Sequence, residues 1–350
     1  MTKILYAIQA TGNGHISRAI QLMPYLKQFG EVDAFISGAN ATLDVPFPVK
    51  YRSKGMSLFY GKCGGLDYWT LAKNTNLFRI HHEARDLPVE QYDLVINDFE
   101  HITALACKKK KVPSVQFGHQ ASFMSAATPR PQQKSMLGEL VLKQYAKATN
   151  YIGLHFQPYD AFIFPPVVKD VFINAQPTDE GHITVYLPAF QQHCLLTYLH
   201  AVPEVHFHFF LPNITAPYRE ANITYMPVNN QLFNQSLLSC HGIITGGGFE
   251  TPAEALYLGK KLMSIPIKGQ YEQQCNAAAL QQMGVTVLDD VKGDFAMQIK
   301  NWLGKKRINI RQEANDVNRT LQFLFDTYPS KKMDPGFDLN ARIKPERSFV

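Results

Sequence analysis

The hydrophobic residues in the first half of the chain alternate between strand-like runs and helical patterns. Lys3 to Ala10 forms the apolar run of a buried strand, a glycine-bearing turn follows, and the helical spacing from Ile16 to Phe29 stops at Gly30. The alternation continues with a helical stretch from His101 and with strand-like runs at Val32 to Ser37, Asp93 to Asn97 and Ser114 to Phe117. This pattern predicts a mainly parallel sheet flanked by helices.

A second alternation of the same kind follows Phe164-Pro165-Pro166-Val167-Val168, which we interpret as a linker because paired prolines stiffen an extended connection. Strands are predicted at Ile183 to Leu187, Val205 to Leu211, Ile223 to Pro227, Gly242 to Thr245, Leu262 to Pro266 and Thr286 to Leu288. Helical patterns at Asp294 to Leu303 and Ile310 to Tyr328 close the chain. We therefore predict two doubly wound α/β domains, residues 1–165 and 166–330, and a poorly ordered polar tail, 331–350.

The alternation fails between residues 55 and 90. In place of a regular pattern, this segment contains the glycines and aromatic residues Phe59, Tyr60, Gly61, Gly64, Gly65, Tyr68 and Trp69. An irregular binding loop is the expectation there.

Length and composition indicate a folded, enzyme-sized protein. The 350 residues exceed what one hydrophobic core usually organises, and 45% hydrophobic against 18% charged residues excludes a disordered chain. The formal net charge of +6 favours weak attraction to anionic partners. No nucleic-acid-binding motif accompanies the charge, so we expect no nucleic acid partner.

The cysteine and histidine spacings do not indicate a metal site. The five cysteines, Cys63, Cys107, Cys194, Cys240 and Cys275, are scattered and never form C-x-x-C, so neither a disulfide framework nor a zinc site is signalled. His206 and His208 share one face of a strand, an arrangement more typical of packing than of metal binding. The apolar run after Lys3 is too short for a signal peptide or a membrane span, and we expect a cytoplasmic protein.

Thr11-Gly12-Asn13-Gly14-His15 lies where the first strand leads into the first helix. Its glycines allow the backbone to approach a ligand closely, and the helix N-terminus favours negative charge. A dinucleotide fingerprint would need glycine where Ser17 stands, and no Gly-Lys-Ser/Thr follows for a P-loop. The turn therefore presents His15 at the carboxyl edge of the sheet, either as a general base or as a histidine that only packs the turn.

A run of three glycines, Gly246-Gly247-Gly248, also follows a predicted strand and precedes a helix. Consecutive glycines leave backbone N–H groups open to a diphosphate at a helix N-terminus. Two interpretations of Glu254 remain open: a carboxylate that binds a ligand, or the third helical residue of a capping box in which Thr251 is the N-cap.

The third polar segment runs from Pro266 through Glu272 and Gln273 to Asn276. Clustered amides and a carboxylate can hydrogen-bond several sugar hydroxyls at once, although a solvated helix start is the simpler explanation. All three motifs fall at the carboxyl ends of strands, where sheets of this kind bind ligands. We therefore predict the site in the cleft between the two domains.

Together these residues resemble the inverting, nucleotide-sugar-dependent glycosyltransferases of GT-B fold, and are similar to the family 28-like group of the peptidoglycan N-acetylglucosaminyltransferase. The resemblance spans the chain and rests on Gly12-Asn13-Gly14-His15, on Gly246 through Glu254, and on Pro266 followed by Glu272-Gln273-x-x-Asn276-Ala277. It implies two Rossmann-like domains that face each other across a cleft, and a helix at about 310–330 that packs back on the first domain.

The resemblance also implies roles for single residues. The glycine loop contacts diphosphate, Glu254 holds ribose hydroxyls, and Glu272 and Gln273 touch the donor sugar. The full implied donor-binding set is Gly246, Gly247, Gly248, Phe249, Thr251, Glu254, Glu272 and Gln273. Contacts to acceptor or phosphate are expected from Gly12, Asn13, Gly14, His119 and Gln120, although core or turn duty is an open alternative for the last two.

An inverting reaction is the expected one. Retaining GT-B enzymes often carry two glutamates eight positions apart around this helix, but the residue eight before Glu254 is Gly246. We expect His15 as the base that deprotonates the acceptor, with Asp98 as its orienting partner or its replacement. Asp98 precedes His101 closely enough to be a helix N-cap instead.

The expected function is therefore transfer of a sugar from a nucleoside diphosphate sugar, by resemblance a UDP-sugar, to a hydroxyl acceptor, without metal or cofactor. Two alternatives stay open: a nucleotide-sugar 2-epimerase of the same fold, and a non-catalytic nucleotide- or glycan-binding protein. Lys108 to Lys111 end a helix as a solvated face, or support a weak peripheral contact with the inner face of a membrane together with Tyr68 and Trp69. The sequence predicts neither the acceptor nor the oligomeric state.

Overall fold

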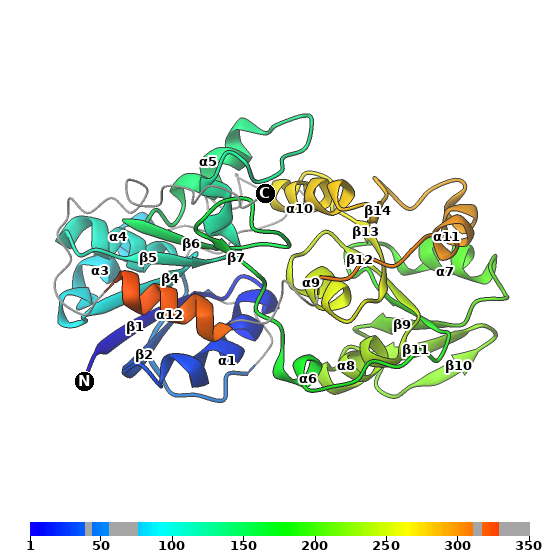
Figure 1. The fold of residues 1–350 in the computed structure, drawn as a ribbon, viewed down its shortest axis with the longest axis horizontal. Helices are drawn as coiled ribbons and strands as arrows, with labels where there is room; N and C mark the ends of the chain where they lie inside the picture. Colours follow the sequence, from blue (N-terminus) through cyan, green and yellow to red (C-terminus); the bar gives the residue numbers. More distant parts are fainter. Residues whose placement is uncertain (39–43, 56–75, 311–316, 329–350) are drawn as a thin grey trace, which may run out of the picture.

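The computed structural model describes residues 1–38, 44–55, 76–310 and 317–328, and these form two α/β halves, each around a seven-stranded sheet (Figure 1). The strands of the first sheet are all parallel and lie in the order β3-β2-β1-β4-β5-β6-β7. Their bounds are β1 Lys3–Gln9, β2 Glu31–Ser37, β3 Val49–Ser53, β4 Leu94–Asp98, β5 Val115–Gly118, β6 Asn150–Leu154 and β7 Ile163–Phe164. The helices of this half are α1 Asn13–Leu26, α3 Leu77–Asp86, α4 His101–Lys110 and α5 Met136–Gln144, with short 3-10 helices η1 Val89–Gln91 and η2 His119–Met124.

The second sheet has the order β10-β11-β9-β8-β12-β13-β14 and is parallel except for the antiparallel edge pair β10·β11. Its strands are β8 Ile183–Tyr186, β9 Phe207–Leu211, β10 Tyr218–Glu220, β11 Ile223–Pro227, β12 Gly242–Gly246, β13 Lys261–Ile265 and β14 Thr286–Val287. Its helices are α6 Asp170–Ile173, α7 Gln192–His200, α8 Asn230–Ser239, α9 Glu250–Tyr257, α10 Tyr271–Gln282 and α11 Phe295–Leu303. The prediction of two doubly wound sheets is confirmed.

The central strand β1 explains why the site forms where it does. Ile4, Tyr6 and Ile8 pack into one core on one side of the sheet, while Leu5 and Ala7 pack into a second core on the other side. Burial on both faces accounts for the continuous apolar run. Strand order reverses at β1, which pairs with both β2 and β4, and at β8, which pairs with both β9 and β12. Such reversals open a crevice at the carboxyl ends of the strands.

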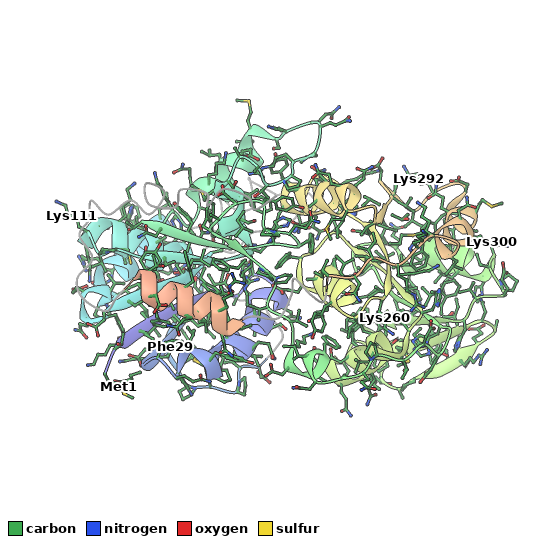
Figure 2. All side chains as sticks on the ribbon, in the orientation of Figure 1. Met1, Phe29, Lys111, Lys260, Lys292 and Lys300 are labelled. Carbon is green, nitrogen blue, oxygen red and sulfur yellow. The ribbon has the colours of Figure 1, made fainter. Side chains whose placement is uncertain are left out.

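The helix α12 (Val317–Thr327) lies against α1 of the first half, although it follows the second half in sequence (Figure 1). Phe325 stacks on Phe29, which is labelled in Figure 2, with ring centroids 4.0 Å apart. Leu321 and Leu324 are fully buried in the same core as α1. The two halves are therefore linked by this helix as well as by the connection through α6.

Three expectations about local structure need correction or lie outside the described residues. The irregular segment expected over 55–90 is wrong at its end, because Leu77–Asp86 is helical: Asn76 caps it by accepting from the Arg79 N–H. The expected linker starts inside a strand, since Phe164 ends β7. Several predicted features lie outside the described residues. They are the glycines, aromatic residues and cysteine Phe59, Tyr60, Gly61, Cys63, Gly64, Gly65, Tyr68 and Trp69, residues 311–316 of the last helical pattern, and the tail at 331–350.

Among the residues described, no helix is both long and apolar enough to cross a membrane.

Candidate functional site

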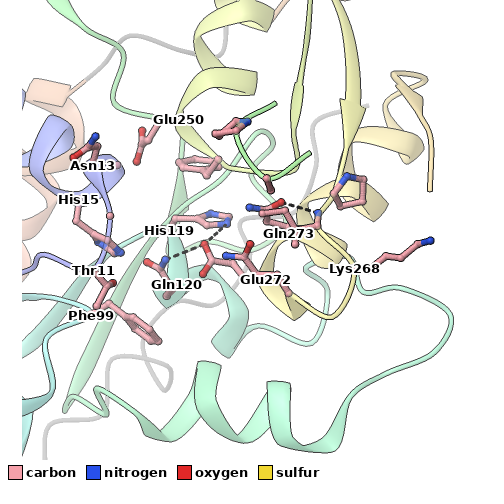
Figure 3. A pocket seen from close by; sticks show the side chains of 18 of the residues that line it. Thr11, Asn13, His15, Phe99, His119, Gln120, Glu250, Lys268, Glu272 and Gln273 are labelled. Atoms are coloured by element: carbon pink, nitrogen blue, oxygen red, sulfur yellow. Dashed lines mark hydrogen bonds and ion pairs between the residues drawn. The ribbon is translucent and has the colours of Figure 1, made fainter. Parts of the chain in front are cut away.

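A cavity of about 780 Å³ lies between the two halves, at the carboxyl ends of both sheets (Figure 3). The turn after β1 and the start of η2 line one side, and the segments after β8, β12 and β13 line the other. Its size is typical of a site for a small molecule. The predicted residues that line it are Gly12, Asn13, Gly14, His15, His119, Gln120, Phe249, Glu272 and Gln273.

His15 and Asp98 form a hydrogen-bonded pair at the edge of this cavity. His15 lies in the first turn of α1, and its Nδ1 is 2.9 Å from Oδ1 of Asp98, the last residue of β4. When Nδ1–H donates to the carboxylate, the other ring nitrogen is left free to accept a proton. The His15 side chain keeps 13% of its surface exposed, whereas Asp98 is fully buried. The structure thus brings together the two residues that were predicted as base and orienting partner.

Arg18, one turn further along α1, also contacts Asp98. Its Nε and Nη2 donate to the two carboxylate oxygens of Asp98 at 3.0 and 2.8 Å. Burial alone would raise the pKa of Asp98, but the charges of Arg18 and His15 outweigh it and hold that pKa at about 2. Gly118 leaves room for this carboxylate: its φ is 153°, and a Cβ there would lie 2.7 Å from Asp98 Oδ1. Asp98 is therefore ionised at neutral pH.

Asp98 does not cap the following helix. Glu100 is the N-cap of α4, and its carboxylate accepts from the backbone N–H groups of Ile102 and Thr103 at 2.8 and 2.6 Å. The interpretation of Asp98 as a helix N-cap is wrong, and its carboxylate contacts His15 and Arg18 instead.

The glycine loop leads from β12 into α9, and its glycines have different surroundings. Gly246 and Gly248 line a smaller cavity of about 160 Å³ that shares Gln273 and Ile267 with the larger one, and Thr251 also lines it. A Cβ on Gly248 would meet nothing within 4 Å, so its backbone is open. Gly247 instead packs under α10, where a Cβ would lie 2.8 Å from the Gln273 carbonyl oxygen.

Glu254 is not part of a capping box. The helix α9 begins at Glu250 with Phe249 as N-cap and without a side-chain cap, so the alternative with Thr251 as cap is wrong. The Glu254 carboxylate is buried and lies 3.1 Å from Lys169 Nζ. Burial raises its pKa and Lys169 opposes that rise. Glu254 lines neither cavity, and its carboxylate is paired with Lys169 instead of facing a ligand site.

Gln273 joins the glycine loop to the end of β13. Its Oε1 accepts from the backbone N–H groups of Gly247 and Ile267 at 3.2 and 3.0 Å, which leaves its amide nitrogen for the cavity. Asn276 supports the same loop by donating to the Gly247 carbonyl at 3.0 Å.

His119 and Gln120 bridge the two halves. The His119 ring stacks on Phe249 with centroids 3.9 Å apart, and its Nε2 lies 2.7 Å from Asn276 Oδ1. Burial lowers the pKa of His119. Gln120 donates to Glu272 Oε1 at 3.0 Å, as the dashed line in Figure 3 shows. Both residues therefore position the second half against the first, and both line the cavity.

Sequence reasoning missed two residues of the site, Arg18 and Glu250. Arg18 Nη1 donates to Glu250 Oε1 across the cavity, which links α1 of the first half to the start of α9 in the second. The signal for Arg18 was its spacing of three from His15, which places both on one face of α1. Glu250 is the first residue of α9 after the glycine loop, at the helix end that attracts negative charge.

His208 of β9 and His206, the residue before β9, both contact neighbouring side chains. His208 stacks on His182 with centroids 3.7 Å apart, and His206 Nε2 lies 2.8 Å from Thr224 Oγ1. Within the described residues, no group of three or more histidine, cysteine, aspartate or glutamate side chains is arranged to hold a metal ion.

The profile of the family described as Glycosyl transferase family 1 matches residues 2–305. No curated protein sequence matches the chain. Among solved structures, Phytolacca americana UGT2 complexed with UDP-2fluoro-glucose and pterostilbene is similar, with a TM-score of 0.60 and 13% identity over 93% of this chain and 98% of that one. Arabidopsis thaliana UGT89C1 complexed with UDP has a TM-score of 0.58 and 11% identity over 94% and 100%.

A bacterial structure has the same fold. The glycosyltransferase SnogD from Streptomyces nogalater has a TM-score of 0.51 and 15% identity over 92% of this chain and 99% of that one. At these identities the likeness shows the fold, which is GT-B.

Proposed function

The chain belongs to glycosyl transferase family 1 and is a glycosyltransferase of GT-B fold, and from this premise we propose that it transfers a sugar from a UDP-sugar to a hydroxyl acceptor with inversion at the anomeric carbon. The observation that carries the proposal is the His15–Asp98 pair at the edge of the cavity between the halves. A histidine fixed by a buried carboxylate is suited to remove a proton from a hydroxyl.

The proposed step is a single displacement. The free ring nitrogen of His15 takes the proton of the acceptor hydroxyl while the oxygen bonds to the anomeric carbon. The bond from that carbon to the phosphate oxygen breaks, and the nucleoside diphosphate leaves with the electron pair. Asp98 stabilises the imidazolium that forms, because its pKa of about 2 keeps it ionised.

Donor binding is proposed for the second half. The open backbone at Gly248 and the N-terminus of α9 suit a diphosphate, and Glu272 and Gln273 suit sugar hydroxyls. The UDP-2fluoro-glucose and UDP complexes of the two plant structures support a UDP-sugar. A ribose contact by Glu254 requires that Lys169 give way, because the two are paired in the structure.

The test combines binding with turnover. Purified protein, without added metal, is titrated calorimetrically with UDP, GDP, dTDP and NAD, and UDP release from UDP-sugars is followed with a panel of hydroxyl acceptors. We expect selective UDP binding and acceptor-dependent release. His15→Ala should keep the UDP affinity and lose at least about 100-fold in transfer rate, as expected when a general base is removed.

Other outcomes assign other functions. A changed sugar formed without any acceptor would indicate the 2-epimerase of the same fold. UDP binding with every donor left intact would indicate a binding protein. Transfer at the wild-type rate by His15→Ala would move the base to Asp98 or elsewhere.

A further inference from the structure

The cavity between the halves has an excess of negative side chains. Four carboxylates line it, Glu250, Glu272, Asp289 and Asp290, against two permanently charged basic side chains, Arg18 and Lys268; the histidines His15 and His119 also line it. Both basic groups are already paired: Lys268 Nζ lies 2.7 Å from Asp290 Oδ2, and Arg18 pairs with Asp98 and Glu250. If the side chains kept these charges, the negative diphosphate would meet more carboxylates than basic groups, and the repulsion would oppose binding.

Glu250 is the lining carboxylate that directly follows the glycine loop, where the diphosphate is expected. It begins α9 directly after the glycine loop, and its Cγ lies 3.4 Å from the point that a Cβ on Gly14 would occupy. Its side chain is 20% exposed, toward the cavity, whereas the Arg18 that it holds is 2% exposed. The Glu250 side chain therefore lies beside Gly14 of α1 and reaches Arg18.

This inference rests on the proposed UDP-sugar donor. We propose that Glu250 and the donor diphosphate compete for Arg18: when the donor binds, Glu250 takes up one proton from solvent, and Arg18 Nη1 exchanges the carboxylate for a phosphate oxygen. The neutral carboxyl then carries an O–H that can donate to the diphosphate. Donor binding is thereby coupled to the uptake of a proton.

Burial makes Glu250 the group that changes charge, and four charged neighbours adjust its pKa. Arg18 and His15 face it from α1, Asp98 from β4 and Glu254 from its own helix. Burial raises the pKa of Glu250 to about 7; Arg18 and His15 oppose the rise, while Glu254 and Asp98 add to it. Asp98 and Asp290 have pKa values of about 2, so neither gains a proton near neutrality.

The sign of the pH dependence follows from linkage. Below about pH 7 Glu250 is already protonated, so donor affinity is independent of its titration. Above that pH the proton must be taken up on binding, and Kd rises by up to about tenfold for each pH unit. A UDP-hexose is the suitable probe, because its diphosphate is esterified at both ends and lacks the phosphate group that titrates near pH 6.

The experiment is calorimetric titration of the full chain with UDP-glucose from about pH 6 to about pH 8.5, in pairs of buffers that differ in ionisation enthalpy. We expect the wild type to take up close to one proton at the alkaline end and to lose affinity as described. Glu250→Gln should bind with a Kd that is flat across the range and tighter than that of the wild type above about pH 8.

Asp290→Asn is the matched control. It also removes one carboxylate from the cavity lining, but one that stays ionised throughout the range. Its Kd should shift by a similar factor at every pH, with the slope and the proton uptake of the wild type preserved.

Two results would overturn the proposal. UDP-glucose affinity that is independent of pH, without proton uptake, would refute it while leaving the proposed function intact. Failure of UDP-glucose and UDP to bind at any pH would refute both. If Glu250→Gln does not fold, Glu250→Ala, which also removes the carboxyl, is titrated in its place; a variant that keeps the slope and the proton uptake of the wild type would overturn the proposal.

Discussion

Gly247 and Gly248 are adjacent but meet opposite constraints. A Cβ on Gly247 would lie 2.8 Å from the Gln273 carbonyl oxygen and 2.9 Å from Pro266 Cβ, whereas one on Gly248 would meet nothing within 4 Å. We expect Gly247→Ala to destabilise the fold by about 1–3 kcal/mol, through overpacking. Gly248→Ala should leave Tm unchanged and weaken UDP binding, because its methyl group narrows the approach to the backbone.

Thermal unfolding and calorimetric titration of both variants test this pair. Wild-type UDP affinity in Gly248→Ala would show that the diphosphate does not lie against this glycine.

Asp98 offers a second prediction at the level of the residue. Its pKa of about 2 lies below the ordinary value of 3.8, so the ionised form stabilises the folded state. This contribution is fully present above about pH 4 and is lost as the pH falls through about 2. Asp98→Asn should lower the free energy of unfolding by about 3 kcal/mol at neutral pH, since the buried Arg18 loses the partner that is fully ionised there.

Urea unfolding of Asp98→Asn and the wild type at about pH 7 and about pH 3 measures this effect. The difference in free energy of unfolding between the two proteins should be smaller at about pH 3 than at about pH 7. A difference that is equal at both pH values would contradict an ionised Asp98 that stabilises the fold.

At the level of elements, the helix α12 joins the end of the chain to the first half. Leu321 is fully buried in the core shared with α1, and Gln322 beside it is exposed. Leu321→Ala should lower the free energy of unfolding by about 2–5 kcal/mol. Gln322→Ala, the control on the same helix, should change it by less than about 0.5 kcal/mol.

Denaturant unfolding distinguishes the two variants. Changes in the free energy of unfolding that are equally small for both variants would mean that α12 is not packed on the first half in solution.

Buried strands and the polar turns at their ends could be predicted from the sequence because their pattern is local. Ile4, Leu5, Tyr6, Ala7 and Ile8 are all fully buried, which gives an unbroken apolar run. The helix α3 was missed because Ile80 and Ala84 are its only buried residues, and polar side chains dominate the rest. The strands β7 and β10 are only two and three residues long, too short for a pattern.

Part of the site could be predicted from the sequence for the same reason. His15 and Asp98 end neighbouring parallel strands or their turns, so their proximity follows from topology. The contacts of Arg18 with Glu250 and of Lys169 with Glu254 depend on how the two halves and their connection pack. No local pattern encodes that placement.

At the level of the whole molecule, side chains of both halves meet around the cavity. Arg18 contacts Glu250, His119 contacts Asn276 and Gln120 contacts Glu272. On the outer side Tyr271 of α10 donates to Glu139 of α5 at 2.8 Å. These pairs hold the two halves against each other around the cavity that lies between them.

The anomeric configuration of the product shows whether the reaction is a single displacement with His15 as base. A UDP-hexose whose sugar is α-linked is incubated with an acceptor that supports UDP release, and the product is followed by proton NMR from the first turnovers. A single displacement gives a β-linked product, which the wild type should form and His15→Ala should not. An α-linked product would contradict it, because retention cannot arise from one attack by a hydroxyl that His15 deprotonates.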